Sequence, residues 1–224
     1  MPREGYQEKL DRVRDDVLYM SEVVLERLRM GLDALERKDN EIAWDVIEGD
    51  HEVNEMYLEL ESDCVDLLAL QQPVAGDLRF IAASFKIITD LERVGDLATN
   101  LGDYSLDAQQ AVFPEVDVQE IGDATIEMVE EAMAAYAAED AEACYEIADR
   151  DDEIDVMCER ASETVARDLI EREDAGSEEE IQRLMRDVYR LLLTIRDLER
   201  VGDHAVNIAA RTLYMVENDD DLLY

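Results

Sequence analysis

Apolar residues recur at steps of three and four along almost the whole chain, which is the period of an α-helix. No segment shows the sustained apolar–polar alternation of a strand, so we expect an all-α fold. The pattern predicts six helices, near residues 5–37, 41–71, 77–110, 117–138, 141–173 and 178–217.

The predicted breaks between helices carry recognisable capping residues. Asp39 and Asp140 each precede an apolar-periodic stretch and are suitable N-caps. Ser177 and Glu180 form a capping box, in which each side chain satisfies a backbone amide near the other residue. Proline and glycine interrupt the pattern in QQPVAGD at 71–77, and AVFPEVD at 111–117 is the clearest break near the middle of the chain.

The chain contains an internal repeat. The phrase DLERVGD occurs at 90–96 and again at 197–203, and segment 39–56 aligns with segment 140–157. A match of this length predicts two copies of one three-helix unit, at 1–113 and 114–224. Helices of about 30 residues are about 45 Å long, which suits two tandem, extended antiparallel three-helix bundles. Trp44 aligns with Tyr145, and we expect both to be core aromatics.

The repeated phrase offers carboxylate pairs at helical spacing. Glu92 with Asp96, and Glu199 with Asp203, each lie on one helix face because residues four apart are neighbours there. The preceding helix of each half offers a second pair at the same spacing, Asp50 with Asn54 and Asp151 with Asp155. Two facing pairs would supply four oxygen ligands, which suit hard cations such as Mg, Mn or iron(III). An interaction face or a helix-packing device is the alternative interpretation.

The other letters of the phrase have simpler explanations. Leu91 and Val94 are expected in the core, Gly95 at a close helix contact, and Arg93 and Arg200 in charge pairs with nearby acids. If the phrase serves only the helical structure, Asp90 and the other acids of the phrase are expected to form a solvated helix face.

Enzymatic chemistry finds little support in the sequence. Glu48 and His51 form one E-x-x-H element, but di-iron carboxylate proteins need two, and the other histidine, His204, lacks the matching glutamate. No phosphate-binding loop, nucleophile elbow or HExxH motif is present. A di-iron metalloenzyme therefore has less support than a cation-binding protein or a metal-free interaction protein, and we do not expect an enzyme.

The charge balance bears on the classes of partner that the protein can bind and on the salt content of its source. The formal net charge is -38, with 59 acidic and 21 basic residues, which disfavours nucleic acid and anionic membranes as direct partners. Acidic excess with only three lysines is typical of proteins from a high-salt cytoplasm, so we expect a halophilic source. Cys64, Cys144 and Cys158 form no CxxC motif and are expected to be buried thiols in a reducing compartment. We see no signal peptide and no apolar run long enough for a membrane span.

The segments at 71–100 and 191–209 closely resemble the signature helices of the PhoU family, and the likeness covers nearly the whole chain. The resemblance implies a cytoplasmic accessory protein of the phosphate ABC transporter that negatively regulates phosphate uptake and the phosphate-starvation response. Its implied partners are the ATPase subunit of the transporter and a membrane sensor kinase, and we expect a homodimer.

The resemblance also implies metal on E(D)xxxD helix faces, with iron or zinc, in some members as multinuclear clusters. Asn54 departs from the acidic pattern, so the first half is expected to bind metal less tightly. The residues carried over to these faces are Glu92, Asp96, Glu199, Asp203, Asp151, Asp155, Asp50 and Asn54.

The acidic composition predicts stabilisation by salt. At molar salt the Debye length is about 3 Å, so repulsion within so acidic a surface is largely screened. We expect the Tm to rise between low and molar KCl in thermal unfolding followed by circular dichroism. An unchanged Tm across that range would show that the acidity is not an adaptation to salt.

Overall fold

The protein is described by a computed structural model that covers residues 2–70, 73–106, 116–171 and 176–223. Six α-helices account for nearly all of these residues, and no strand occurs among them. They are α1 (Pro2–Arg37), α2 (Asn40–Leu70), α3 (Ala75–Leu106), α4 (Val118–Ala138), α5 (Ala141–Glu171) and α6 (Glu178–Glu217), followed by a short 3-10 turn, η1 (Asp221–Leu223). The all-α prediction is therefore confirmed, and the observed helices lie close to the predicted ranges.

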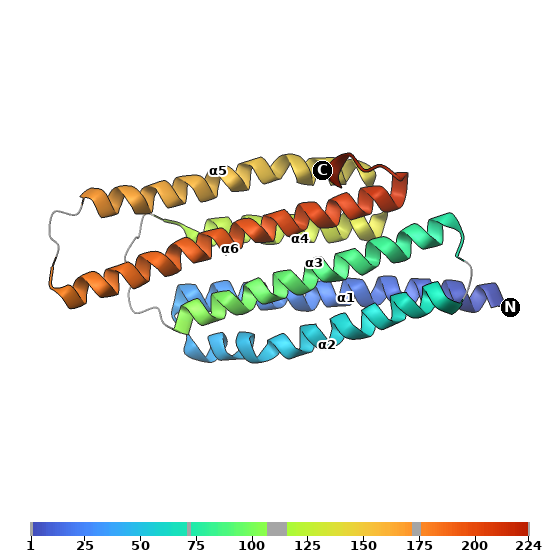
Figure 1. Cartoon of the computed structure of the whole chain (residues 1–224), viewed down its shortest axis with the longest axis horizontal. Coiled ribbons are helices and arrows are strands. Elements are labelled where there is room, and N and C mark those ends of the chain that lie inside the picture. Colours follow the sequence, from blue (N-terminus) through green and yellow to red (C-terminus); the bar gives the residue numbers. More distant parts are fainter. Residues whose placement is uncertain (1, 71–72, 107–115, 172–175, 224) are drawn as a thin grey trace.

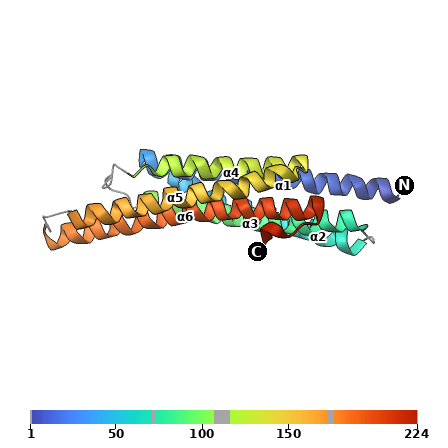
Figure 2. The same ribbon diagram turned by 90° about the horizontal axis from the view of Figure 1, so that it is seen from above.

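The helices form two three-helix bundles placed side by side (Figure 1). Helices α1, α2 and α3 pack against one another, and so do α4, α5 and α6. The bundles meet where α3 packs on α6 and α1 packs on α4. Seen from above, α1 and α4 lie along one side of the molecule, and α3 and α6 lie along the other (Figure 2). The sequence boundary at 113/114 falls outside the described residues.

The predicted N-cap residues mark the starts of α2, α5 and α6 in the structure. Asp39 Oδ1 accepts from the Glu41 amide at 2.9 Å, and Asp140 Oδ1 accepts from the Glu142 amide at 3.0 Å. Ser177 caps α6 with the reciprocal Glu180 contact of a capping box. Among the described helices, none combines the length and the apolar composition that a membrane span requires.

The core follows the predicted helical stripe, with two exceptions. The three cysteines are free and buried, and Leu91 and Val94 are fully buried. Trp44 and Tyr145, expected in the core, are instead 53% and 38% exposed. Each follows a buried residue directly, Ala43 or Cys144, so it lies about 100° around its helix from the apolar stripe.

The contact between the bundles depends on two buried aspartates. Asp90 on α3 accepts from His204 Nδ1 at 2.9 Å and from Asn207 at 3.4 Å, both on α6. Asp197 on α6 accepts from Tyr104 Oη at 2.8 Å and from Asn100 at 3.1 Å, both on α3. We call this reciprocal set the aspartate clasp.

The clasp corrects the expectation that Asp90 belongs to a solvated face. Asp90 is 7% exposed and Asp197 is 0% exposed. Buried carboxylates are tolerated only when hydrogen bonds or opposite charges satisfy them. Here each one accepts hydrogen bonds from the opposite bundle, and Asp197 also pairs with Arg196 and Arg200 on its own helix. The clasp therefore sets the register in which α3 and α6 lie antiparallel.

Removal of one clasp charge should destabilise the protein. In an Asp197→Asn variant the bonds from Tyr104 and Asn100 lose a charged acceptor, and the ion pair with Arg196 at 2.9 Å is lost. We expect the free energy of unfolding in urea to fall by about 2–3 kcal/mol, the scale of hydrogen bonds to charged groups. Asp103→Asn, an exposed change on α3, is the control and should have little effect. Equal effects of the two substitutions would refute the structural role of the clasp.

Candidate carboxylate centres

The first carboxylate centre lies between α2 and α3. Gly95 allows the two helices to approach closely, since a Cβ at that position would lie 3.1 Å from Val53 Cγ1. Asp50 lies close enough to raise the pKa of both Glu92 and Asp96. The structure thus gathers the predicted residues of the first half on one surface.

The second centre repeats this arrangement between α5 and α6. A Cβ at Gly202 would lie 3.1 Å from Asp151 Oδ1, so the glycine again permits the close approach. Asp151, Asp155, Glu199 and Asp203 lie near one another, as their mutual effects on pKa require. All eight predicted ligand positions therefore fall into two centres, one for each half.

The second centre is under electrostatic strain. Burial raises the pKa of Asp151 to about 6, and the charges of Asp155 and Asp203 add to the increase. Burial and then Asp155 raise the pKa of Glu199 and of Asp203 as well. Asp151 Oδ1 is buried and has no hydrogen-bond partner. An unpaired buried carboxylate oxygen beside other acids is what a cation would stabilise.

The first centre is less strained because Asn54 replaces an acid. Its amide nitrogen donates to Asp50 Oδ2 at 2.8 Å, and Thr99 Oγ1 donates to Asp50 Oδ1 at 3.4 Å. Burial, followed by a neighbouring acid, still raises the pKa of Glu92 and of Asp96. The sequence asymmetry thus becomes a physical one, with Asp50 satisfied by the protein and Asp151 not.

Neither centre brings its ligands together as tightly as a closed metal site does. Within the described chain, three carboxylate, histidine or cysteine ligand atoms lie within 4.8 Å of one another only at Asp219, Asp220 and Asp221. That group is a largely exposed acidic turn beside η1, and we assign it no role. The donors of the two centres fit hard cations in chemistry, but three of them reach one ion only after side-chain rotation.

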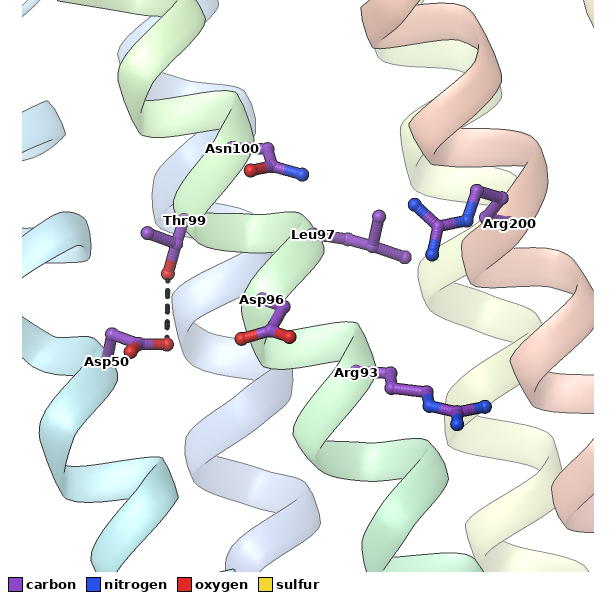
Figure 3. Close-up of a pocket in the computed structure, with 7 residues that line it drawn as sticks. All are labelled: Asp50, Arg93, Asp96, Leu97, Thr99, Asn100 and Arg200. Atoms are coloured by element: carbon purple, nitrogen blue, oxygen red, sulfur yellow. Dashed lines mark hydrogen bonds between the residues drawn. The ribbon is translucent and has the colours of Figure 1, made fainter.

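Each centre opens into a shallow cavity. The first cavity, of about 400 Å³, is lined by residues of α2, α3 and α6, including Asp50, Asp96, Arg93 and Arg200 (Figure 3). The second, of about 350 Å³, is lined by Asp151, Asp203 and again Arg200. Arg200 also lies 3.6 Å from Asp197, as the predicted charge pairing requires. It therefore links the clasp to both centres.

The sequence contained an overlooked signal for the clasp. The repeated phrase continues to an identical asparagine, as DLERVGDLATN at 90–100 and DLERVGDHAVN at 197–207. These asparagines are the donors that reach the opposite aspartate. The first aspartate of the phrase and the asparagine ten positions later thus form one unit, while the glutamate and last aspartate serve the centres.

The histidines do not assemble a di-iron site. His51 is exposed, and its Nδ1 contacts the backbone oxygen of Glu48. His204 is buried and bonded to Asp90. The two histidines thus lie on different helices and have different contacts, His51 with its own helix and His204 with the clasp.

Comparisons with known proteins give a consistent result. A family model described as the PhoU domain matches residues 17–105 and 118–212, one match in each half. The chain is 35% identical over 217 residues to a phosphate-specific transport system accessory protein PhoU homolog of Pseudomonas putida, covering 95% of this chain and 80% of that relative. It is 32% identical to PhoU homolog 1 of Methanothermobacter thermautotrophicus, covering 96% of this chain and 95% of the relative.

Solved structures agree with this result. The crystal structure of PhoU from Pseudomonas aeruginosa superposes with a TM-score of 0.87 at 30% identity, covering 96% of this chain and 100% of that one. The phosphate transport system regulatory protein PhoU from Streptococcus pneumoniae gives a TM-score of 0.83 at 26% identity, covering 96% and 98%.

The strain at Asp151 predicts a pH effect on the metal-free protein. An acid whose pKa is higher in the folded than in the unfolded chain binds its proton more tightly when folded. The stability that the protonated Asp151 carboxyl contributes is therefore present below its ordinary pKa of 3.8 and is lost as the pH rises through its folded-state pKa of about 6. We expect Asp151→Asn to raise the free energy of unfolding near pH 7, in chelator, by roughly 1 kcal/mol, the scale of one partly screened charge contact.

The nearby Glu153→Gln is a matched control, because it removes the same charge from an exposed position on the same helix. Urea unfolding of both variants, near pH 7 and near pH 5, makes the comparison. If Glu153→Gln stabilises as much as Asp151→Asn, overall charge rather than the second centre is responsible.

Proposed function

The chain belongs to the PhoU domain family, and from this membership we propose that it is a negative regulator of phosphate uptake and of the phosphate-starvation response. The observation that carries the proposal is the match of both repeats to the family, together with relatives named as accessory proteins of the phosphate-specific transport system. On this proposal the chain has no catalytic role and acts by binding.

The proposed partner is the ATPase subunit of the phosphate ABC transporter, with a membrane sensor kinase as a second partner. A cytoplasmic location follows from these partners. Homodimerisation and a high-salt source are part of the proposal, the latter supported by the net charge of -38.

We further propose that the two carboxylate centres bind metal, iron or zinc foremost, with Mn and Mg as alternatives. The unpartnered Asp151 Oδ1 and the raised pKa values of its neighbours support this assignment. A bound cation would neutralise the like charges and join α5 to α6, or α2 to α3. The second centre would hold the cation more tightly than the first, because Asn54 of the first centre is a neutral ligand. Its four ligands would be Asp151, Asp155, Glu199 and Asp203.

A metal-free helical adaptor is the second candidate function. It is favoured by the spread of the ligand atoms, since neither centre holds three of them within 4.8 Å of one another. It is also favoured by the clasp, in which donors of the protein itself satisfy the two aspartates. In this alternative the carboxylates contact a partner directly.

Phosphate uptake in the source organism tests the proposed regulatory role. Deletion of the gene in the source organism should raise phosphate uptake in phosphate-rich medium, and the wild-type gene should restore control. Uptake that is unaffected by the deletion would contradict the regulatory role.

A variant with alanine at Glu92, Asp96, Glu199 and Asp203 separates the metal-binding function from the metal-free adaptor in metal analysis. Purified wild type should contain stoichiometric metal, and the variant should lose most of it while it remains folded by circular dichroism. Asp11→Ala with Asp15→Ala, an i and i+4 pair of exposed acids on α1, is the control and should retain the metal. Equal metal content in wild type and variant excludes the assigned centres, and a wild type that never holds metal favours the adaptor.

A further inference from the structure

Arg200 on α6 belongs to both carboxylate centres. It lines the cavity of the first centre together with Asp96, and it lines the cavity of the second centre together with Asp203. Its side chain reaches from α6 towards α3, across the space between the two helices (Figure 3). Its counterpart in the other repeat, Arg93, lines only the first of these two cavities. The repeat is therefore asymmetric in its arginines as well as in its acids.

The Arg200 guanidinium acts on one carboxylate of each centre. Burial raises the pKa of Asp96 and of Asp203, and the positive charge of Arg200 opposes the increase at both. Arg93 opposes it at Glu92 and Asp96, which both belong to the first centre. A guanidinium stays charged at any pH at which the protein is folded. One fixed positive charge is thus shared by two centres that are rich in acids.

The clasp does not hold Arg200 in its place. Arg200 Nη1 lies 3.6 Å from Asp197 Oδ1, beyond the range of a good hydrogen bond, whereas Arg196 Nη2 lies 2.9 Å from the same oxygen. Asp197 also accepts from Tyr104 and Asn100. The Arg200 side chain is 47% exposed. It can therefore rotate towards either centre and leave Asp197 satisfied.

Arg200 lies between the two centres and is committed to neither. Among the described residues its one ion pair is the loose contact with Asp197. Asp96 and Asp203 are near enough for their pKa values to respond to it, and they attract it from the two sides. Its position is therefore a balance between two negative groups, and a change in the charge of one group must move that balance.

A cation in one centre would move Arg200 towards the other. The second centre would fill first, because its four acids are the more strained set and the first centre contains the neutral Asn54. Like charges repel, so a cation held there would drive Arg200 from Asp203 towards Asp96. Arg93 and Arg200 would then both lie against the first centre, and both would oppose the entry of another cation.

We propose that Arg200 is a shared counter-charge, which moves towards Asp96 when the second centre holds a cation and so lowers the affinity of the first centre for another. The inference rests on the proposed metal binding and adds a coupling between the two centres. Couplings between sites typically change affinity about 5- to 150-fold, and the effect is reciprocal. Over a range of metal concentrations the chain should therefore hold one cation and leave the first centre empty.

Calorimetric titration of the full chain tests the coupling, after treatment with chelator that is then removed. Zn²⁺, Mn²⁺ and, without oxygen, Fe²⁺ are added at an ionic strength of about 0.1 M, where the Debye length is about 10 Å. The wild type should bind in two separate steps. Arg200→Gln should tighten both steps, and the weaker step more, so that the ratio of the two dissociation constants shrinks at least about fivefold. Arg200→Lys retains the charge and should retain the wild-type ratio.

Two other arginines of the same region provide matched controls. Arg93→Gln removes the same charge beside the first centre alone, so it should tighten only the weaker step. Arg196→Gln removes the charge that pairs most closely with Asp197, but Arg196 lines neither cavity, so both steps should stay as in the wild type. Circular dichroism should show that all variants are folded under the conditions of the titration.

Each other outcome identifies its own error. If the wild type binds none of the three ions, the proposed metal binding is wrong and the inference falls with it. If the wild type binds them and Arg200→Gln leaves the ratio of the two steps unchanged, unequal ligands explain the steps and only the inference is overturned. Equal tightening in Arg93→Gln, Arg196→Gln and Arg200→Gln would show a general effect of charge, and a single cation in both wild type and Arg200→Gln would show that the first centre is no site. Either result also overturns the inference.

Discussion

The arrangement of the whole molecule depends on two carboxylates that are buried between α3 and α6. Asp90 and Asp197 have almost no access to water, so each needs donors, and both find them on the helix of the other bundle. Hydrogen bonds of this kind have narrow geometry, which apolar packing alone lacks. They therefore fix how far one bundle can slide along the other, and with it the positions of the two carboxylate centres and of Arg200 between them.

The acids of the repeated phrase have opposite energetic roles. The first aspartate is satisfied by the fold, whereas Asp151, Glu199 and Asp203 repel one another at partly buried positions. Local conflicts of this sort persist in proteins at functional sites, where a ligand relieves them. Asn54 relieves part of the conflict in the first centre, since its amide donates to Asp50. Burial and neighbouring acids still raise the pKa of Glu92 and of Asp96, so the chain holds a more strained and a less strained version of one centre.

Helical periodicity and capping residues were sufficient to predict six helices and most of their ends, because both are local properties of the chain. The duplicated phrase predicted the two bundles and the grouping of all eight ligand positions. Burial of Asp90 could not be read from spacing, since its donors come from a helix more than a hundred residues away. Trp44 and Tyr145 were misplaced because an aromatic residue beside an apolar stripe looks like part of it. The metal, the homodimer and the high-salt source stay predictions.

The reciprocity of the clasp has a consequence for the two halves as separate polypeptides. Each half contains one aspartate and one asparagine of the set, and each asparagine donates to the aspartate of the other half. Two identical half-chains could exchange these bonds in an isologous contact, in which each copy offers the same surface. Such a contact would weaken on dilution, whereas a tether between the halves gives a fixed effective concentration. In the single chain the paired α3–α6 surface therefore persists however scarce the protein is in the cell.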